Sequence, residues 1–139
     1  MAYCTQEDIE KRIGEEDLVA LADQDGDGEA DEDVVAAAIG DACSLIDSYL
    51  SVHFEVPVDP VPSVVKARAV NLSVYFLRLG RDSATEDARR QYEDDLAWLR
   101  EIVRGDVSLG IEPSAAESER APGVRYEGRR RLFGRDEPL

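Results

Sequence analysis

The sequence is poor in the residues that build most metal and redox sites. Among 139 residues it has two cysteines, Cys4 and Cys43, and one histidine, His53. Two cysteines do not make a disulfide framework or a zinc site, and one histidine excludes a cluster of histidine ligands. Cys43 falls in an apolar helical pattern, so we expect it to be a small buried hydrophobic residue. We expect His53 to be structural.

Long apolar runs and catalytic motifs are also lacking. There is no basic and then apolar leader and no run of about 18 apolar residues, so we expect a protein made in the cytoplasm with no membrane partner. No G-x-S-x-G, P-loop or G-x-G-x-x-G motif occurs. Asp94 and Asp95 are adjacent and must face different sides of a helix, so they are not a paired acid and base. We therefore expect no enzyme.

Positive charge is scarce. The formal net charge is −15, and only two of the sixteen basic residues are lysines. Such a charge repels DNA phosphates and argues against nonspecific DNA binding, although an acidic wall can keep a passing duplex from sticking. With 43% hydrophobic residues, the chain can still bury a core of about one domain.

Apolar residues recur with the period of a helix over most of the chain. The pattern predicts short helices over 5–14 and 15–23 and long ones over 33–52, 63–79 and 83–104, with a capping box at Thr5 and N-caps at Ser63 and at Ser83 or Thr85. The stripe of the fourth helix includes Phe76 and Leu79. The fold class is therefore all-α, a bundle of about five helices in residues 1–105. An extended C-terminal arm over 106–139 follows it.

The stretch 23–33, DQDGDGEADED, resembles site chemistry. Asp23, Asp25, Asp27, Glu29 and Asp31 occupy positions one, three, five, seven and nine of an EF-hand calcium loop, with glycine at position six. Position twelve is Val34 instead of the bidentate glutamate. The alternative is a glycine turn in which Asp31 caps the next helix. No cofactor is required, and a bound Ca²⁺ would pin the loop rather than act as a sensor.

The arm carries a basic and aromatic segment, RYEGRRRLF. The residues that we expect to bind a partner are Arg125, Tyr126, Arg129, Arg130, Arg131 and Phe133. They could contact nucleic acid, or the acidic N-terminal third of a neighbouring copy, or nothing at all. We favour the neighbouring copy.

Four stretches, in this order, resemble small proteins from the head-gene region of Mu-like phages and prophages, which are related to head-to-tail connector (adaptor) proteins. They are MAYCTQEDIEKRIGEEDLVALAD, DGDGEADEDVVAAAIGDACSLIDSYL, PVPSVVKARAVNLSVYFL and QYEDDLAWLREIVRGDVSLG, and they cover roughly residues 1–110. The ending RLFGRDEPL is similar as well.

This resemblance implies a structural virion protein rather than an enzyme. Members would form a ring, of twelve copies, beneath the portal protein, join the head to the tail or head-completion proteins, and line the DNA exit path without binding DNA specifically. The protein would be made in the host cytoplasm and end in the virion. The alternative that the residues leave open is a calcium-binding regulatory or interaction module built on the acidic loop.

Overall fold

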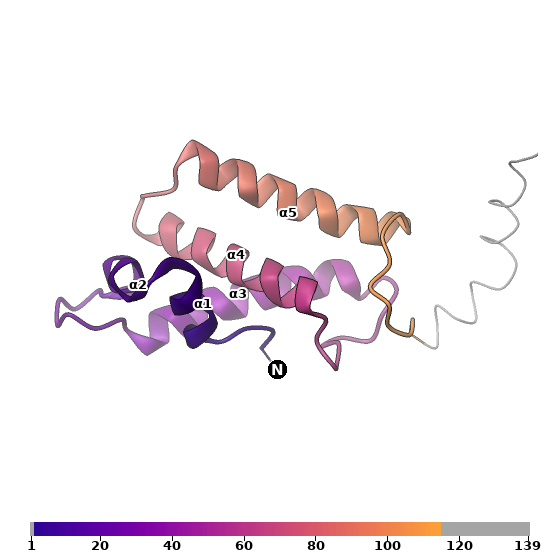
Figure 1. Ribbon diagram of the computed structural model, residues 1–139, viewed down its shortest axis with the longest axis horizontal. Helices are drawn as coiled ribbons and strands as arrows, with labels where there is room; N and C mark the ends of the chain where they lie inside the picture. The colour runs from indigo at the N-terminus through magenta and orange to yellow at the C-terminus, as the bar shows by residue number, and fades with distance from the viewer. Residues whose placement is uncertain (1, 115–139) are drawn as a thin grey trace, which may run out of the picture.

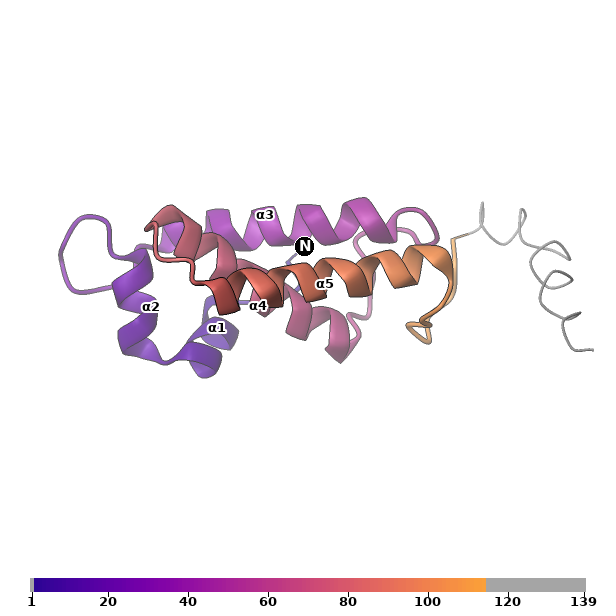
Figure 2. The same ribbon diagram turned by 90° about the horizontal axis from the view of Figure 1, so that it is seen from above.

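Residues 2–114 are described by the computed structural model, and all of their regular structure is helical. The five helices are α1 (Gln6–Ile13), α2 (Glu15–Ala22), α3 (Glu32–Leu50), α4 (Ser63–Gly80) and α5 (Glu86–Arg104). The all-α prediction is confirmed, with two short helices followed by three long ones (Figures 1 and 2).

The three long helices form the body, and α4 is its central element. It packs along α3 and contacts each of the other four helices. The helix α5 lies lengthwise beside α3 and α4, while α1 and α2 close one end of the bundle (Figure 2). All five helices contribute large, fully buried side chains to the core. These are Ile9, Leu18, Ile46, Leu50, Leu72 and Leu99.

Local chemistry sets the helix ends. The capping box of α1 is present, because Thr5 Oγ1 accepts from the backbone N–H of Asp8 and the Asp8 carboxylate accepts from the N–H of Thr5. Thr85 caps α5, and Gly105 ends it in the left-handed conformation with φ 85°. Ser63 was expected to cap α4, but Pro62 holds that position and Ser63 is the first helical residue.

The predicted stripe of α4 is confirmed over its first three positions, Val65, Ala69 and Leu72, which are fully buried, and fails at its C-terminal end. The buried line advances in steps of four through Val65, Ala69, Ser73 and Leu77. Each step of four moves the line slightly around a helix of 3.6 residues per turn, so Phe76 and Leu79 fall on its flank. The prediction that Leu79 faces inward was wrong, since it is 50% exposed.

The packed body extends past α5. Val107, Leu109 and Ile111 pack against the core, and the N–H of Ser114 donates to the carbonyl oxygen of His53 at 2.7 Å. The first nine residues of the predicted arm thus lie against the bundle. The rest of the predicted arm falls outside the described residues.

Candidate functional site

The acidic loop joins α2 to α3 and is held closed by its own backbone. Both carboxylate oxygens of Asp23 accept from backbone N–H groups, from Gly26 at 2.7 Å and from Gly28 at 2.9 Å. Gly26 and Gly28 have φ of 79° and 85°, where a side chain is disfavoured. At the far end, Asp31 Oδ2 accepts from the N–H of Gln24 at 2.9 Å. Asp31 is the N-cap residue of α3 by position, although its side chain bonds Gln24 instead of the helix.

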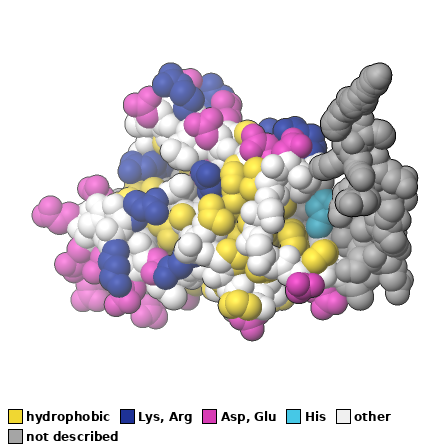
Figure 3. Space-filling model, turned by 45° about the vertical axis from the view of Figure 1, so that its right-hand side comes forward, with side chains coloured by type: hydrophobic (Ala, Val, Ile, Leu, Met, Phe, Trp, Pro, Cys, Tyr) yellow, Lys and Arg dark blue, Asp and Glu magenta, His cyan; other side chains and the backbone are white. Residues whose placement is uncertain are grey.

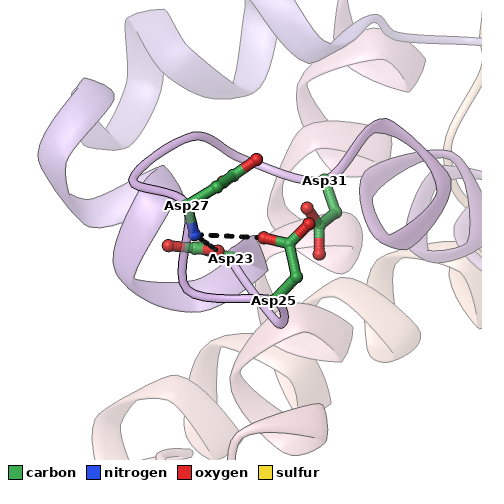
Figure 4. Close-up of side chains that lie close together, drawn as sticks. All are labelled: Asp23, Asp25, Asp27 and Asp31. Atoms are coloured by element: carbon green, nitrogen blue, oxygen red, sulfur yellow. Dashed lines mark hydrogen bonds between the residues drawn. The ribbon is translucent and has the colours of Figure 1, made fainter.

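Four of the five proposed calcium ligands are brought together. One carboxylate oxygen from each of Asp23, Asp25, Asp27 and Asp31 lies within 4.8 Å of the others. Figure 4 shows them around the loop, with the N–H of Asp27 directed at both Asp23 and Asp25. Glu29 is not part of this group.

The twelfth position of the loop offers no ligand. Val34 is half-buried and packs against the core. The two acids before it, Glu32 and Asp33, are exposed in the first turn of α3, where the positive end of the helix dipole favours them. The first half of the loop therefore matches a calcium-binding loop. Its second half matches the alternative interpretation, a glycine turn that leads into the start of α3.

The pKa values of Asp23 and Asp25 are shifted in opposite directions. Hydrogen bonds from the N–H groups of Gly28 and Gly26 lower the pKa of Asp23. The N–H of Asp27 acts in the same direction on Asp25. There, however, desolvation, the hydrogen bond with Asp23 and the charges of Asp27 and Asp31 outweigh it and raise the pKa of Asp25. A cation among these oxygens would relieve that repulsion.

A strongly acidic hollow of about 890 Å³ adjoins the loop. Leu18, Val19 and Val34 contribute its apolar lining, and no lysine or arginine of the described chain lines it. Its acidic residues are Glu10, Glu15, Asp25, Asp27, Glu29, Asp31, Glu32 and Asp33. Acidic side chains crowd the left end of the molecule in Figure 3, the end where Figure 1 places α2 and the loop.

Arg81, just after α4, contacts the start of this loop. Its guanidinium donates to the carbonyl oxygens of Ala20 and Asp23, each at 3.3 Å. A cation at the end of α2 also suits the negative end of that helix dipole. The acidic loop is thus joined to the connection between α4 and α5.

His53 and the two cysteines pack within the helical body. His53 Nε2 lies 2.7 Å from the carbonyl oxygen of Val103 at the end of α5, as its expected structural role requires. Cys43 is buried, as predicted, and so is Cys4; both are free thiols. No helix in the described part of the chain is long and apolar enough to cross a membrane.

One buried ion pair was missed by the sequence reasoning. The Asp95 side chain is 1% exposed, and its Oδ1 accepts from Arg68 at 2.6 Å and from Gln91 at 3.1 Å. The Arg68 guanidinium also lies 4.8 Å from the ring centre of Trp98. Asp94 is exposed, so the two neighbouring acids do face different sides as predicted. The available signal was the position of residue 95, one turn before the buried Leu99.

The predicted partner-binding residues Arg125, Tyr126, Arg129, Arg130, Arg131 and Phe133 lie outside the described residues. The positive charge of this segment contrasts with the negative charge of residues 1–114. Residues 1–114 hold 26 acidic and 10 basic side chains, whereas segment 125–135 holds five arginines and one glutamate.

Comparison with known proteins places the chain. The family model described as "Bacteriophage Mu, Gp36" matches residues 3–127, nearly the whole sequence. The chain belongs to this Mu Gp36 family. "Mu-like prophage FluMu protein gp36" of Haemophilus influenzae is 31% identical over 134 residues, which are 96% of this chain and 94% of that relative. "Gene product J" of Escherichia phage Mu is 30% identical over 119 residues, 85% of this chain and 83% of the relative.

Membership confirms the resemblance to proteins of Mu-like phages. The relatives share almost the full length of the chain, so the helical body, the acidic loop and part of the basic segment all fall within the match. The chain is therefore a phage or prophage protein.

Proposed function

We propose that this protein is a structural component of the virion, a head-to-tail connector that forms a ring beneath the portal protein. The observation that carries the proposal is membership in the Mu Gp36 family. The all-helical body supports it, because rigid packed helices make a stable building block that presents its ends to neighbours. No catalytic role is proposed for any residue.

The charge distribution supports contact between copies of the chain. The acidic hollow carries eight carboxylates, and the sequence places Arg125, Arg129, Arg130 and Arg131 in one short segment. Opposite charges on two surfaces of one protein favour head-to-tail contacts, and such contacts close into rings when the rotation permits. In this proposal the basic segment of one copy lies against the acidic end of the next. DNA passing through the ring would be repelled rather than bound.

A binding experiment tests the connector proposal. Full-length protein is mixed with rings of the portal protein encoded in the same phage genome, and complexes are counted by negative-stain electron microscopy and sedimentation. We expect saturable, stoichiometric binding to portal rings. A protein that ignores portal rings at micromolar concentrations would refute the proposal.

Variants separate the contribution of charge. Replacing Arg129, Arg130 and Arg131 together by glutamate should weaken assembly on the portal, and the loss should be largest at low salt because screening is weakest there. As a control, Arg100→Glu reverses a charge on the exposed face of α5, at a residue with no ion pair among the described residues, and should leave assembly unchanged. Equal losses in the two variants would contradict a specific role for the basic segment.

A second candidate function, binding of a structural Ca²⁺, is favoured by the four gathered carboxylates. We propose that Ca²⁺ pins the 23–31 loop, with Asp23, Asp25, Asp27 and Asp31 as ligands. Without a bidentate ligand at Val34 the affinity should be modest. At ten times the dissociation constant, binding adds about 1.4 kcal/mol to the free energy of unfolding, which raises Tm by about 4–7 °C.

Calorimetric melting with and without Ca²⁺ tests this. Asp25→Asn should abolish the rise in Tm, and Asp41→Asn, on an exposed part of α3, should keep it. Chelator should reverse the rise. An unchanged Tm at millimolar Ca²⁺ would eliminate the pin. A change in portal affinity on adding Ca²⁺ would instead favour the sensor.

A further inference from the structure

A groove of about 460 Å³ lies between α1, α4 and α5. Its floor is apolar and aromatic. Ile13, Val74 and Ala88 line it together with Tyr75 and Tyr92, whose rings are stacked 4.4 Å apart at 15°. Folding has thus left a preorganised aromatic surface at this end of the bundle.

Leu79 is not a lining residue of the groove, but it lies beside it, directly after the lining residue Arg78. It follows Tyr75 by four residues in α4 and so lies on the same side of the helix. It is 50% exposed, the most exposed of the large hydrophobic residues in the described chain. Next to the apolar groove, this exposed side chain adds surface that a docked segment would cover.

Two arginines at the groove are available for an anion. Arg12 and Arg78 both line it, and no carboxylate of the described residues lies within ion-pair distance of either. Within residues 2–114, the side-chain partner of Arg12 is Asn71, whose Oδ1 accepts from its guanidinium. Six of the ten cations in the described chain form an ion pair, and Arg81 and Arg100 are the other two that do not. Asp87 also lines the groove, but its carboxylate pairs with Arg90 at 3.2 Å.

An occupant of this groove must therefore combine apolar or aromatic side chains with negative charge. The chain itself contains such a segment. Residues 132–139, LFGRDEPL, place Leu132 and Phe133 three to five residues before Asp136 and Glu137. We propose that the groove between α1, α4 and α5 is the docking site of residues 132–139 of this protein. Phe133 would pack against the tyrosine stack while the two acids face Arg12 and Arg78.

The length of chain permits this contact. From Ser114, the last described residue, eighteen residues lead to Leu132 and span up to about 60 Å when extended. The helix α5 is only about 28 Å long, so the segment reaches the groove of its own chain or of a neighbour.

The order of positive and negative residues along the C-terminal segment also matches the order of the acidic hollow and the groove on the body. The acidic hollow and the groove share α1, with Glu10 lining the first and Arg12 the second. In the sequence the arginine-rich residues 125–131 come directly before the acidic residues of 132–139. An arm laid across α1 with its arginines at the hollow therefore brings its acids to the arginines of the groove. The proposed contact forms within one copy of the chain or between two copies, and it does not require a bound portal protein.

Photo-crosslinking in the full chain tests the docking. Phe133 is replaced by p-benzoylphenylalanine, the protein is irradiated without any partner, and cross-linked peptides are mapped by mass spectrometry. We expect cross-links to the stretch of α4 with Tyr75 and Leu79 and to the start of α5. The same probe at Ala116 should not label the groove.

Charge reversal provides the matched controls. Arg78→Glu should lower the cross-link yield at the groove about fivefold, the size expected for one exposed ion pair turned repulsive. Arg100→Glu makes the same change at an exposed site outside the groove and should have no effect. The double change Asp136→Arg and Glu137→Arg should also lower the cross-link yield. Combining it with Arg78→Glu should recover part of the yield, because Arg12 still repels one of the new arginines.

Mixing isotopically heavy and light chains shows which copy supplies the segment. Cross-links within one isotope or between the two both support docking, and they distinguish an internal contact from a neighbour. Cross-links scattered over the surface, directed to the acidic hollow, or equal in Arg78→Glu and wild type would overturn the proposal. An absence of cross-links at the groove would overturn it too and leave the groove to another protein.

Discussion

The buried ion pair between Arg68 and Asp95 gives the sharpest test of the fold, because it joins α4 to α5. We consider Arg68→Met, which keeps most of the apolar stem beside Trp98 but removes the charge. The Asp95 side chain is 1% exposed, and its Oδ2 already lacks a hydrogen-bond partner among the described residues. Without Arg68, only Gln91 donates to this carboxylate.

The expected loss follows from that geometry. Removing one partner of a buried pair costs about 3–5 kcal/mol, because the remaining charge stays out of water. The Arg68 side chain is 26% exposed, so water reaches the pair and the lower value, about 3 kcal/mol, applies. For a protein of this size that lowers Tm by about 9–15 °C. It is a large part of the usual total stability of about 5–15 kcal/mol.

Urea unfolding followed by circular dichroism measures this loss, with a shifted midpoint at an unchanged m-value. The double variant Arg68→Met and Asp95→Leu removes both charges and should recover most of the stability. As a control, Arg104→Met breaks an ion pair in which both side chains are 61% exposed and should cost less than about 0.5 kcal/mol. The reasoning is refuted if Arg68→Met costs under about 1 kcal/mol or if the double variant is as unstable as the two single losses summed.

Three further predictions follow from packing, capping and ionisation. Leu77→Ala, in the core, should cost about 2–4 kcal/mol, whereas Leu79→Ala should change stability by under about 0.5 kcal/mol; similar costs in urea unfolding would contradict the assigned face of α4. Thr5→Ala removes the capping box of α1 and should cost about 1 kcal/mol by the same assay, with Thr5→Ser as the variant that retains it. Burial raises the pKa of the Cys4 thiol to about 11. Between about pH 9 and 11 the thiol therefore stays protonated in the folded state but loses its proton in the unfolded state. The free energy of unfolding should fall by up to about 2–3 kcal/mol over that range. The Cys4→Ala variant should lose less stability over that pH range. An identical change of Tm with pH in the wild type and the variant would disprove this prediction.

The helices could be predicted because their signals are local. Periodic apolar residues, the Thr5 capping box and the glycines at 14 and 105 all act within a few residues, and α1, α2 and α5 end where those signals place them. The gathering of Asp23, Asp25, Asp27 and Asp31 was likewise contained in the spacing of one short loop. Whether Ca²⁺ binds there stays a prediction.

The features that the sequence did not reveal depend on distant neighbours. Asp95 is classed as a surface residue by its type, and only the approach of Arg68 from α4 lets it occupy the core. Leu79 is apolar by type, and only the way α4 packs on α3 leaves it in water. The groove and its two arginines arise from three helices, so no single segment could have indicated them.

The contact of Arg81 with the end of α2 has a mechanical consequence. Its guanidinium bridges the carbonyl oxygens of Ala20 and Asp23 to the turn between α4 and α5. Moving the acidic loop away from that turn would break both hydrogen bonds, so the guanidinium opposes such a movement. In the proposed connector, this contact would keep the acidic end aligned with the helical body where neighbouring copies meet.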